Sequence, residues 1–378
     1  MPQPSPAAAW ESSLTNPFGL YIHIPFCLKK CGYCSFYSKT PEKEQKAEFV
    51  KRILEELKKW GGQTARPIDT LYIGGGTPSL LSGEELSAII RAVRENFTLL
   101  PTAEITVEVN PGDGLEAFLS AAKECGVNRI SIGVQSTNDE ELSLLGRRHT
   151  FADAQRTVAL TRNLGFDNIS ADIMIGLPNS TVATLKKSLD GILSLDTDHI
   201  SAYILKLDED SALYKKGTSL PEDDLVCDQY LMMCEAFEKA GFEHYEISNF
   251  AREKKQSRHN NRYWLLSDYL GIGPSAHSLF EGKRFYYTAD LCEFLGGAEP
   301  VFDGEGGDRE EFIMLSLRLS RGLVFEEYEA RYGEKIGEDI VKKAKRLETA
   351  GLVICDQNHI SLTNKGMLVS NAIIGEFI

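Results

Sequence analysis

The sequence predicts an α/β fold in which a parallel sheet curls into a full or partial barrel and a smaller, mostly helical module follows. The chain has 378 residues, enough for one barrel-sized domain and an appended one. Six short apolar, β-branched runs each precede a longer amphipathic stretch, and strands that alternate with helices form parallel sheets. Each expected strand also ends in a polar or glycine-rich cluster, which is where parallel sheets gather functional side chains.

The expected elements follow from the spacing of apolar residues. We expect strands at residues 18–24, 70–75, 104–109, 129–134, 171–177 and 199–205. We expect helices at residues 42–60, 84–97, 114–125, 151–164, 180–194 and 222–240. Ser82 and Asn138 stand shortly before acidic residues, so we interpret both as helix N-terminal signals.

The pattern loosens after about residue 206, into a helix, an irregular segment and a glycine-rich loop. The stretch 296–308, GGAEPVFDGEGGD, has the glycine and acid content of a linker. Beyond it we expect helices at 309–320, 325–332 and 336–350, a hairpin at 351–363 and a last helix at 364–377, which is the order of a winged helix. The predicted domains are a flexible tail at 1–16, a barrel with its extension at 17–300 and a winged-helix-like domain at 301–378.

Composition narrows the class of protein. Hydrophobic residues make up 42% and charged residues 25%, which is typical of a soluble globular enzyme. The net charge of −14 disfavours nucleic acid and anionic membrane surfaces as partners, and no basic stripe marks a recognition helix in the C-terminal module. There is no signal-like start and no apolar run of the roughly 18 residues that would span a bilayer. We therefore expect a cytoplasmic protein without a transmembrane segment.

Three of the eight cysteines form a tight group, C-x3-C-x2-C, made by Cys27, Cys31 and Cys34. Thiolates at such short spacings hold iron–sulfur clusters, and three of them on a four-iron cube leave one iron open for chemistry. A zinc site with His23 as fourth ligand, or three unconnected thiols, are the alternatives; no second pair of the kind that structural zinc uses is present. The other five cysteines lie among apolar neighbours and are expected to be inert: Cys125, Cys227, Cys234, Cys292 and Cys355.

C-x3-C-x2-C after the first strand and GGGTP after the second together resemble the radical S-adenosylmethionine (SAM) family. The resemblance implies a partial (β/α)6 TIM-like barrel that carries a [4Fe-4S] cluster. In that family the open iron chelates the amino and carboxylate groups of SAM. An electron from a low-potential donor then cleaves the sulfonium bond to give a 5′-deoxyadenosyl radical.

The phrases YIHIPFC, GGGTPS, EVNP, GVQS, DIMIGLP and RHNNRYW are similar to the oxygen-independent coproporphyrinogen III oxidase group, over about residues 18–376. That group holds true oxidases and a heme-chaperone branch. The oxidases resemble C-x3-C-x2-C-x-C and have a longer N-terminal arm, whereas here Phe36 takes the place of the further cysteine and only 26 residues precede Cys27. HNNRYW matches the HNxxYW element of the chaperone branch.

The resemblance therefore favours a heme chaperone, which binds heme as cargo and passes it to an acceptor hemoprotein. The alternative is an oxidase that decarboxylates coproporphyrinogen III twice to protoporphyrinogen IX, and a third possibility is a radical SAM enzyme acting on another substrate. Whether the chain is an enzyme stays open, and no residue is assigned a catalytic role.

The resemblance also carries over individual residues that hold SAM. They are Tyr21, Gly75, Gly76, Thr77, Glu108, Gln135, Arg147 and Asp172. Glycines let the backbone approach a ligand, carboxylates accept from ammonium or ribose hydroxyl groups, and a guanidinium suits a carboxylate. The alternative interpretation is that these residues only pair with one another at the strand ends. For Arg147 the neighbouring Arg148 and His149 leave the register open by one residue.

His259 of HNNRYW is the candidate heme-linked residue, because imidazole is the usual protein ligand of heme iron and Tyr263 and Trp264 offer aromatic faces. The alternative is a hydrogen-bonded core histidine. His277 and Cys234 are rival candidates. His23, four residues before Cys27, is expected to orient the cluster loop by a hydrogen bond.

Overall fold

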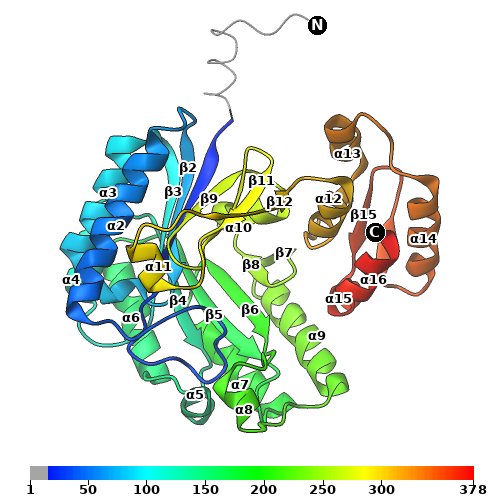
Figure 1. The fold of residues 1–378 in the computed structure, drawn as a ribbon. Helices are drawn as coiled ribbons and strands as arrows, with labels where there is room; N and C mark the ends of the chain where they lie inside the picture. Colours follow the sequence, from blue (N-terminus) through cyan, green and yellow to red (C-terminus); the bar gives the residue numbers. More distant parts are fainter. Residues whose placement is uncertain (1–15) are drawn as a thin grey trace, which may run out of the picture.

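The computed structural model describes residues 16–378, so the tail expected at residues 1–16 lies outside the described residues except for its last position. Six parallel strands follow one another in chain order and form the middle of a twelve-stranded sheet (Figure 1). They are β1 (Phe18–Ile24), β2 (Ile68–Gly75), β3 (Leu99–Val109), β4 (Arg129–Gln135), β5 (Ile169–Ile175) and β6 (His199–Ile204). All six predicted strands are confirmed, with shifts of a few residues at their ends.

The crossover helices cover the outer face of this sheet (Figure 1). They are α2 (Lys43–Gly61), α3 (Gly83–Asn96), α4 (Glu116–Glu124), α6 (Phe151–Asn163), α7 (Val182–Ser194) and α9 (Asp223–Lys239), with the short α5 (Asp139–Leu145) and α8 (Ala212–Lys215) between them. Both N-terminal signals are confirmed, because the Ser82 and Asn138 side chains accept from backbone N–H groups in the first turns of α3 and α5. None of the described helices is both long and apolar enough to cross a membrane.

Side chains alternate between the two faces of each strand, which separates an apolar layer under the helices from a polar barrel interior. In β1, the side chains of Leu20, Ile22 and Ile24 are fully buried in the layer under the helices, whereas Tyr21 and His23 contact groups inside the barrel. The apolar side supplies the burial that stabilises the fold, at about 25 cal/mol per Å² of apolar surface. The polar side is free to serve chemistry.

The sheet remains open, so the predicted partial barrel is confirmed. Its strand order is β12-β11-β10-β9-β1-β2-β3-β4-β5-β6-β8-β7. The strands added at its edges are β7 (Glu243–Glu246), β8 (Asn249–Ala251), β9 (Tyr269–Ile272), β10 (His277–Phe280), β11 (Lys283–Tyr286) and β12 (Val301–Glu305). β9 runs parallel to β1, and the remaining edge strands pair in antiparallel fashion.

Sequence patterns missed these edge strands because each has only three to five residues, too few to show a period of two. The difference is clearest in the stretch interpreted as linker, where β12 pairs with β11, for example Glu305 with Lys283. Its glycines and exposed acids have the composition of a loop, although the backbone is paired. Likewise, residues 364–377 form two helices, α15 (Asn364–Leu368) and α16 (Ser370–Phe377), because Val369 has non-helical dihedral angles.

The C-terminal part is mostly helical and has the expected order of elements (Figure 1). Its helices α12 (Arg309–Ser316), α13 (Phe325–Tyr332) and α14 (Glu338–Thr349) precede β14 (Val353–Cys355) and β15 (His359–Leu362), which pair with the two-residue β13 (Leu323–Val324) in a small antiparallel sheet. Backbone hydrogen bonds from Ile247 to Arg318 (2.9 Å) and from Ser320 to Tyr245 (3.0 Å) join this part to β7 and the turn after it. The short helices α10 (Arg258–Trp264) and α11 (Leu291–Leu295) complete the described chain.

Helix α10 packs at the N-terminal ends of β1 and β2 and closes that end of the barrel. The Glu104 carboxylate accepts from the backbone N–H groups of Arg258 and His259 at 3.1 and 3.0 Å, which caps the helix. The Arg262 guanidinium pairs with Asp69 and donates to two backbone carbonyls. A Cβ at Gly19 would lie 2.6 Å from the Arg262 side chain, so a larger residue there would displace Arg262.

Candidate cofactor site

A cavity of about 400 Å³ opens at the carboxyl ends of the parallel strands. Ten of the eleven residues that the sequence predicts for the cluster and SAM line it: Cys27, Cys31, Cys34, Gly75, Gly76, Thr77, Glu108, Gln135, Arg147 and Asp172. These residues come from five neighbouring strands or the loops after them and from the end of one helix, so the parallel topology brings them together.

The cysteine loop follows β1 and is anchored on both sides. The backbone N–H of Cys27 donates to Lys39 (3.0 Å), and that of Gly32 donates to Leu145 at the end of α5 (2.9 Å). The Cys27 thiol lies 3.5 Å from the Thr77 hydroxyl, and the Arg147 guanidinium donates to the Cys31 sulfur at 3.5 Å. The cysteine loop is thus held beside the glycine loop after β2 and beside Arg147.

His23 fulfils the orienting role that the sequence predicts. Its Nε2 donates to the Tyr37 carbonyl in the cysteine loop (3.0 Å), so its Nδ1 accepts from the Tyr21 hydroxyl (2.9 Å). Burial lowers the pKa of His23 to about 4, so the ring is neutral. Both nitrogens are occupied, which argues against His23 as a zinc ligand.

Within residues 16–378, no three His, Cys, Asp or Glu side chains are gathered closely enough to hold a single metal ion. A four-iron cube has a different requirement, because each thiolate binds a separate iron. Three thiols around one cavity suit the cube rather than zinc.

The glycine loop after β2 leaves no room for side chains. Gly75 has φ +106°, and a Cβ there would lie 2.5 Å from the His23 ring. A Cβ at Gly76 would lie within 2.9 Å of the backbone of Ile24 and Phe26. This close packing sets the loop backbone directly beside the first turn of the cysteine loop, where a ligand of the cluster would lie.

Two carboxyl groups deep in the cavity are held in an unfavourable environment. Burial raises the pKa of Glu108 to about 7, although hydrogen bonds from the Tyr72 hydroxyl (2.7 Å) and the Gly75 N–H (2.9 Å) oppose the shift. Burial likewise raises the pKa of Asp172 to about 6, against a hydrogen bond from Ser201. A cationic, hydroxyl-rich ligand such as SAM would stabilise both carboxylates.

Of Arg147, Arg148 and His149, only Arg147 lines this cavity. Its Nη2 donates to the Asn110 side chain and to the Gly133 carbonyl, both at 2.6 Å. Its Nε is buried without a partner. An unpaired buried donor costs free energy unless a ligand completes it.

The residues present therefore fit a [4Fe-4S] cluster with SAM: three thiols, a glycine cradle, two destabilised carboxyl groups and an incomplete guanidinium. Two family models match the chain: the radical SAM superfamily over residues 21–192, and the HemN C-terminal domain over residues 308–369.

Comparison with characterised proteins extends the match to nearly the whole chain. Heme chaperone HemW of Bacillus subtilis is 33% identical over 95% of this chain and 98% of its own length. Heme chaperone HemW of Escherichia coli is also 33% identical, over 96% of this chain and 98% of its own. The chain belongs to the HemW family of radical SAM proteins. Membership in the radical SAM superfamily implies a [4Fe-4S] cluster and SAM as cofactors.

Other relatives support the same assignment. The mitochondrial radical S-adenosyl methionine domain-containing protein 1 of Danio rerio is 33% identical over 98% of this chain and 87% of its own. Among solved structures, coproporphyrinogen III oxidase (HemN) of Escherichia coli superposes with a TM-score of 0.84 over 98% of this chain and 93% of its own, at 23% identity. The last comparison establishes the shared fold.

Several residues around the HemW-family cavity were missed by sequence reasoning. They include Asn110, Ser131, Gly133, Met174 and Tyr203. Asn110 bridges the site, since its amide nitrogen donates to Thr77 (2.8 Å) while its oxygen accepts from Arg147. Its place in the EVNP phrase was the available signal.

Two predicted residues lie outside the cavity lining. Tyr21 lies behind it and contacts His23. His259 lies in α10 at the closed end of the barrel, where Thr70 and Tyr263 are the hydrogen-bond partners of its two ring nitrogens. The rival candidates are elsewhere as well: His277 stacks on Tyr286 at the sheet edge, and Cys234 is buried in α9.

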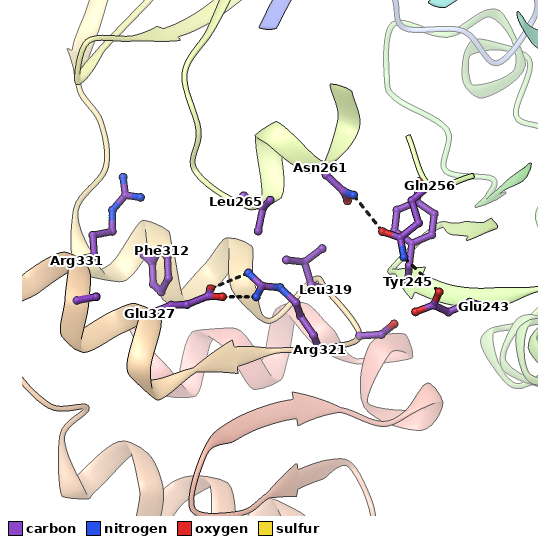
Figure 2. A pocket seen from close by; sticks show the side chains of 12 residues that line it. Glu243, Tyr245, Gln256, Asn261, Leu265, Phe312, Leu319, Arg321, Glu327 and Arg331 are labelled. Carbon is purple, nitrogen blue, oxygen red and sulfur yellow. Dashed lines mark hydrogen bonds and ion pairs between the residues drawn. The ribbon is translucent and has the colours of Figure 1, made fainter. Parts of the chain in front are cut away.

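A second, wider groove of about 720 Å³ lies between α10 and the C-terminal part (Figure 2). Its charges balance, with Arg321 and Arg331 opposed by Glu243 and Glu327. Figure 2 shows Arg321 paired with Glu327 by two hydrogen bonds. None of the predicted site residues lines this groove.

Proposed function

We propose that this protein is a heme chaperone, which binds heme and transfers it to an acceptor hemoprotein. The heme would bind at the mouth of the barrel, which is the opening of the cavity at the carboxyl ends of the parallel strands. The observation that carries the proposal is the chemistry of the mouth. Phe36, Tyr203 and Ile204 line the cavity and expose 67%, 41% and 42% of their surfaces. Large exposed apolar side chains gathered at one cavity are typical of a binding surface.

The charge of the same rim suits a dicarboxylate. Lys29, Lys30 and Lys206 line the cavity, with Asp208 as the acidic residue among them. This local excess of positive charge stands out in a chain of net charge −14. A flat apolar macrocycle with two propionates matches an apolar, lysine-bordered rim.

When bound, the reduced cluster supplies the electron that can cleave SAM. Cys27, Cys31 and Cys34 would bind the cluster. The glycine loop and Arg147 would contact the methionine part of SAM, and Glu108 and Asp172 would accept hydrogen bonds from SAM. A low-potential electron donor and an acceptor hemoprotein are the partners this function requires. We propose the cytoplasm as its compartment, and neither nucleic acid nor membrane as a partner.

The oxidase is the second candidate, and one observation favours it. Every residue carried over from the group as a SAM contact, apart from Tyr21, lines a single cavity. Phe36 argues against the oxidase. It takes the position of the oxidases' further cysteine, lines the cavity with a ring and has no thiol.

The test is an anaerobic assay of the reconstituted, reduced chain with SAM and coproporphyrinogen III, beside a heme titration followed by absorbance. We expect stoichiometric heme uptake and no turnover. Substitution of the rim phenylalanine, Phe36→Ser, is expected to weaken heme binding about tenfold, because burial of an aromatic side chain contributes on the order of 1–3 kcal/mol.

Phe302→Ser is the matched control. Phe302 is 61% exposed but lies on β12 at the sheet edge, outside the cavity lining. Its substitution should leave heme affinity unchanged. Multiple turnovers to protoporphyrinogen IX would establish the oxidase instead, and equal losses in the two variants would remove the rim from the proposal.

A further inference from the structure

His259 lies at the closed end of the barrel and is almost fully buried, with 1% of its surface exposed. Its Nδ1 is 2.9 Å from the Thr70 hydroxyl, and its Nε2 is 2.9 Å from the Tyr263 hydroxyl. Burial lowers its pKa to about 3, and Arg262 adds to the shift, so the ring is neutral. Both nitrogens are engaged, so a ring held in this way has none left for heme iron.

The His259 ring packs against two tyrosines of the barrel interior. Its centroid lies 5.2 Å from that of Tyr72 and 6.4 Å from that of Tyr21, and the two tyrosines are 6.1 Å apart. Rings at these distances are in direct contact and restrict one another's rotation. The orientation of His259 is thereby transmitted to both tyrosines.

Tyr72 connects His259 to the glycine loop after β2. Its hydroxyl donates to one oxygen of the Glu108 carboxylate at 2.7 Å, and the other oxygen accepts from the Gly75 N–H at 2.9 Å. Because Glu108 is held from both sides, a displaced Tyr72 would release the carboxylate and loosen the glycine loop.

Tyr21 connects His259 to the cysteine loop. Its hydroxyl donates to His23 Nδ1 at 2.9 Å, and His23 Nε2 donates to the Tyr37 carbonyl at 3.0 Å, three residues beyond Cys34. The His23 ring also fills the space beside Gly75. Both branches therefore end at the cofactor cavity.

We infer that His259 is a positioning residue for the cofactor site, which holds Tyr72 and Tyr21 so that Glu108, the glycine loop and the cysteine loop keep the geometry that SAM needs. This role does not involve heme and goes beyond the proposed function. Buried polar networks of this kind restrict the core to one arrangement when every member is satisfied.

The test measures SAM binding to the anaerobically reconstituted full-length chain. His259→Leu is expected to weaken SAM binding about tenfold, the effect of losing roughly one buried hydrogen bond. It should also reduce the change that saturating SAM produces in the electron paramagnetic resonance spectrum of the reduced cluster. His259→Gln, whose amide reaches toward Tyr263, should restore part of both.

His199→Leu is the matched control, because His199 is fully buried and its ring nitrogens contact the Ser170 and Tyr245 hydroxyls at 2.7 and 2.8 Å. Its ring packs on Tyr245 and not on the tyrosines that contact His259. We expect a similar loss of thermal stability with at most a threefold change in SAM affinity. Equal effects of the two substitutions on SAM binding would overturn the inference.

Tyr72→Phe gives an independent measurement if the leucine variant does not fold, because it keeps the ring and removes only the bond to Glu108. We expect a several-fold loss of SAM affinity that is not additive with that of His259→Gln, since both act through one set of contacts. Additive effects would overturn the inference. So would a His259→Leu variant that binds SAM normally and has lost the absorption of histidine-ligated heme.

Discussion

The two ends of the barrel use buried polar residues differently. At the mouth, Arg147 Nε has no partner, and burial raises the pKa values of Glu108 and Asp172. At the closed end, the Glu104 carboxylate is occupied by two backbone N–H groups and Arg262 is paired with Asp69. The mouth holds buried carboxyl groups at raised pKa, whereas the carboxylates of Glu104 and Asp69 at the closed end hold α10, although Arg262 Nε there also lacks a partner.

This difference teaches where a ligand belongs. An unsatisfied buried polar group costs about 1–3 kcal/mol, but one such atom is no signal by itself, because Arg262 Nε is unpaired as well. The mouth differs because its unpaired donor and its two carboxyl groups of raised pKa line one cavity. A polar interior alone is no such signal, because His199 and His259 are both buried and both fully engaged within the chain. The predictions below test whether the two ends behave as this contrast requires, from the largest expected effect to the smallest.

Substitution of any one cluster cysteine should abolish cofactor assembly. Cys27→Ala, Cys31→Ala and Cys34→Ala are each expected to lose the broad visible absorption that follows anaerobic reconstitution, because three thiolates leave no spare ligand. Cys234→Ala is the control, since that thiol is buried in α9 away from the cavity. Absorption that survives all three single changes would mean that no cluster is held here.

At the closed end, Arg262→Ala should cost stability and spare the cluster. Arg262 is buried, whereas its partner Asp69 is half-buried and keeps Arg258 at 3.6 Å. The loss should therefore be about 1–3 kcal/mol, less than the roughly 3–5 kcal/mol that breaking a fully buried pair costs. Urea unfolding should show the loss. Arg346→Ala breaks the exposed pair with Glu376 and should cost no more than about 0.5 kcal/mol. A variant of Arg262 that is as stable as the Arg346 variant would contradict this contrast between buried and exposed pairs.

How far the sequence predicts the fold depends on element length. The strand β1 and the helix α2 have enough residues for their periods of 2 and 3.6 to be visible, and both were predicted. β8 has three residues and β13 has two, so no period can be read, and their pairing is fixed by distant partners. The break between α15 and α16 at Val369 was not predicted, because the apolar pattern of a helix continues across it.

How far the sequence predicts the site depends on whether a residue belongs to a motif. The cysteines and the glycine loop stand in recognisable phrases, and their meeting follows from parallel strands ending at one edge. The bonds of His259 depend on Thr70, which is 189 positions away in the chain, so the phrase HNNRYW could not show that the ring is occupied. Lys206 and Tyr203 likewise join the rim only through the position of β6.

The binding of SAM should depend on pH through Glu108. Only the ionised carboxylate carries the negative charge that attracts a cationic ligand, and its pKa is raised to about 7. The affinity should therefore fall as the pH drops through 7, by about tenfold between pH 8 and pH 6 for one group. Titration calorimetry across this range should show the fall, and Glu108→Gln should bind weakly at every pH with a flattened profile. An unchanged profile in that variant would assign the dependence to another group.

The smallest expected effect concerns the lysines of the rim. Lys30→Glu and Lys206→Glu should each weaken heme binding only a few-fold, because an exposed charge interaction contributes about 0.2–1 kcal/mol. Salt should remove the effect, since at roughly 1 M the screening length falls to about 3 Å. The pair of Arg262 and Asp69 at the closed end is much less exposed to ions, so most of the loss caused by Arg262→Ala should persist at the same salt concentration. A rim effect that resists salt would mean that these lysines contact the propionates in a desolvated pocket, and the mouth would then resemble the closed end more than its exposed aromatic side chains indicate.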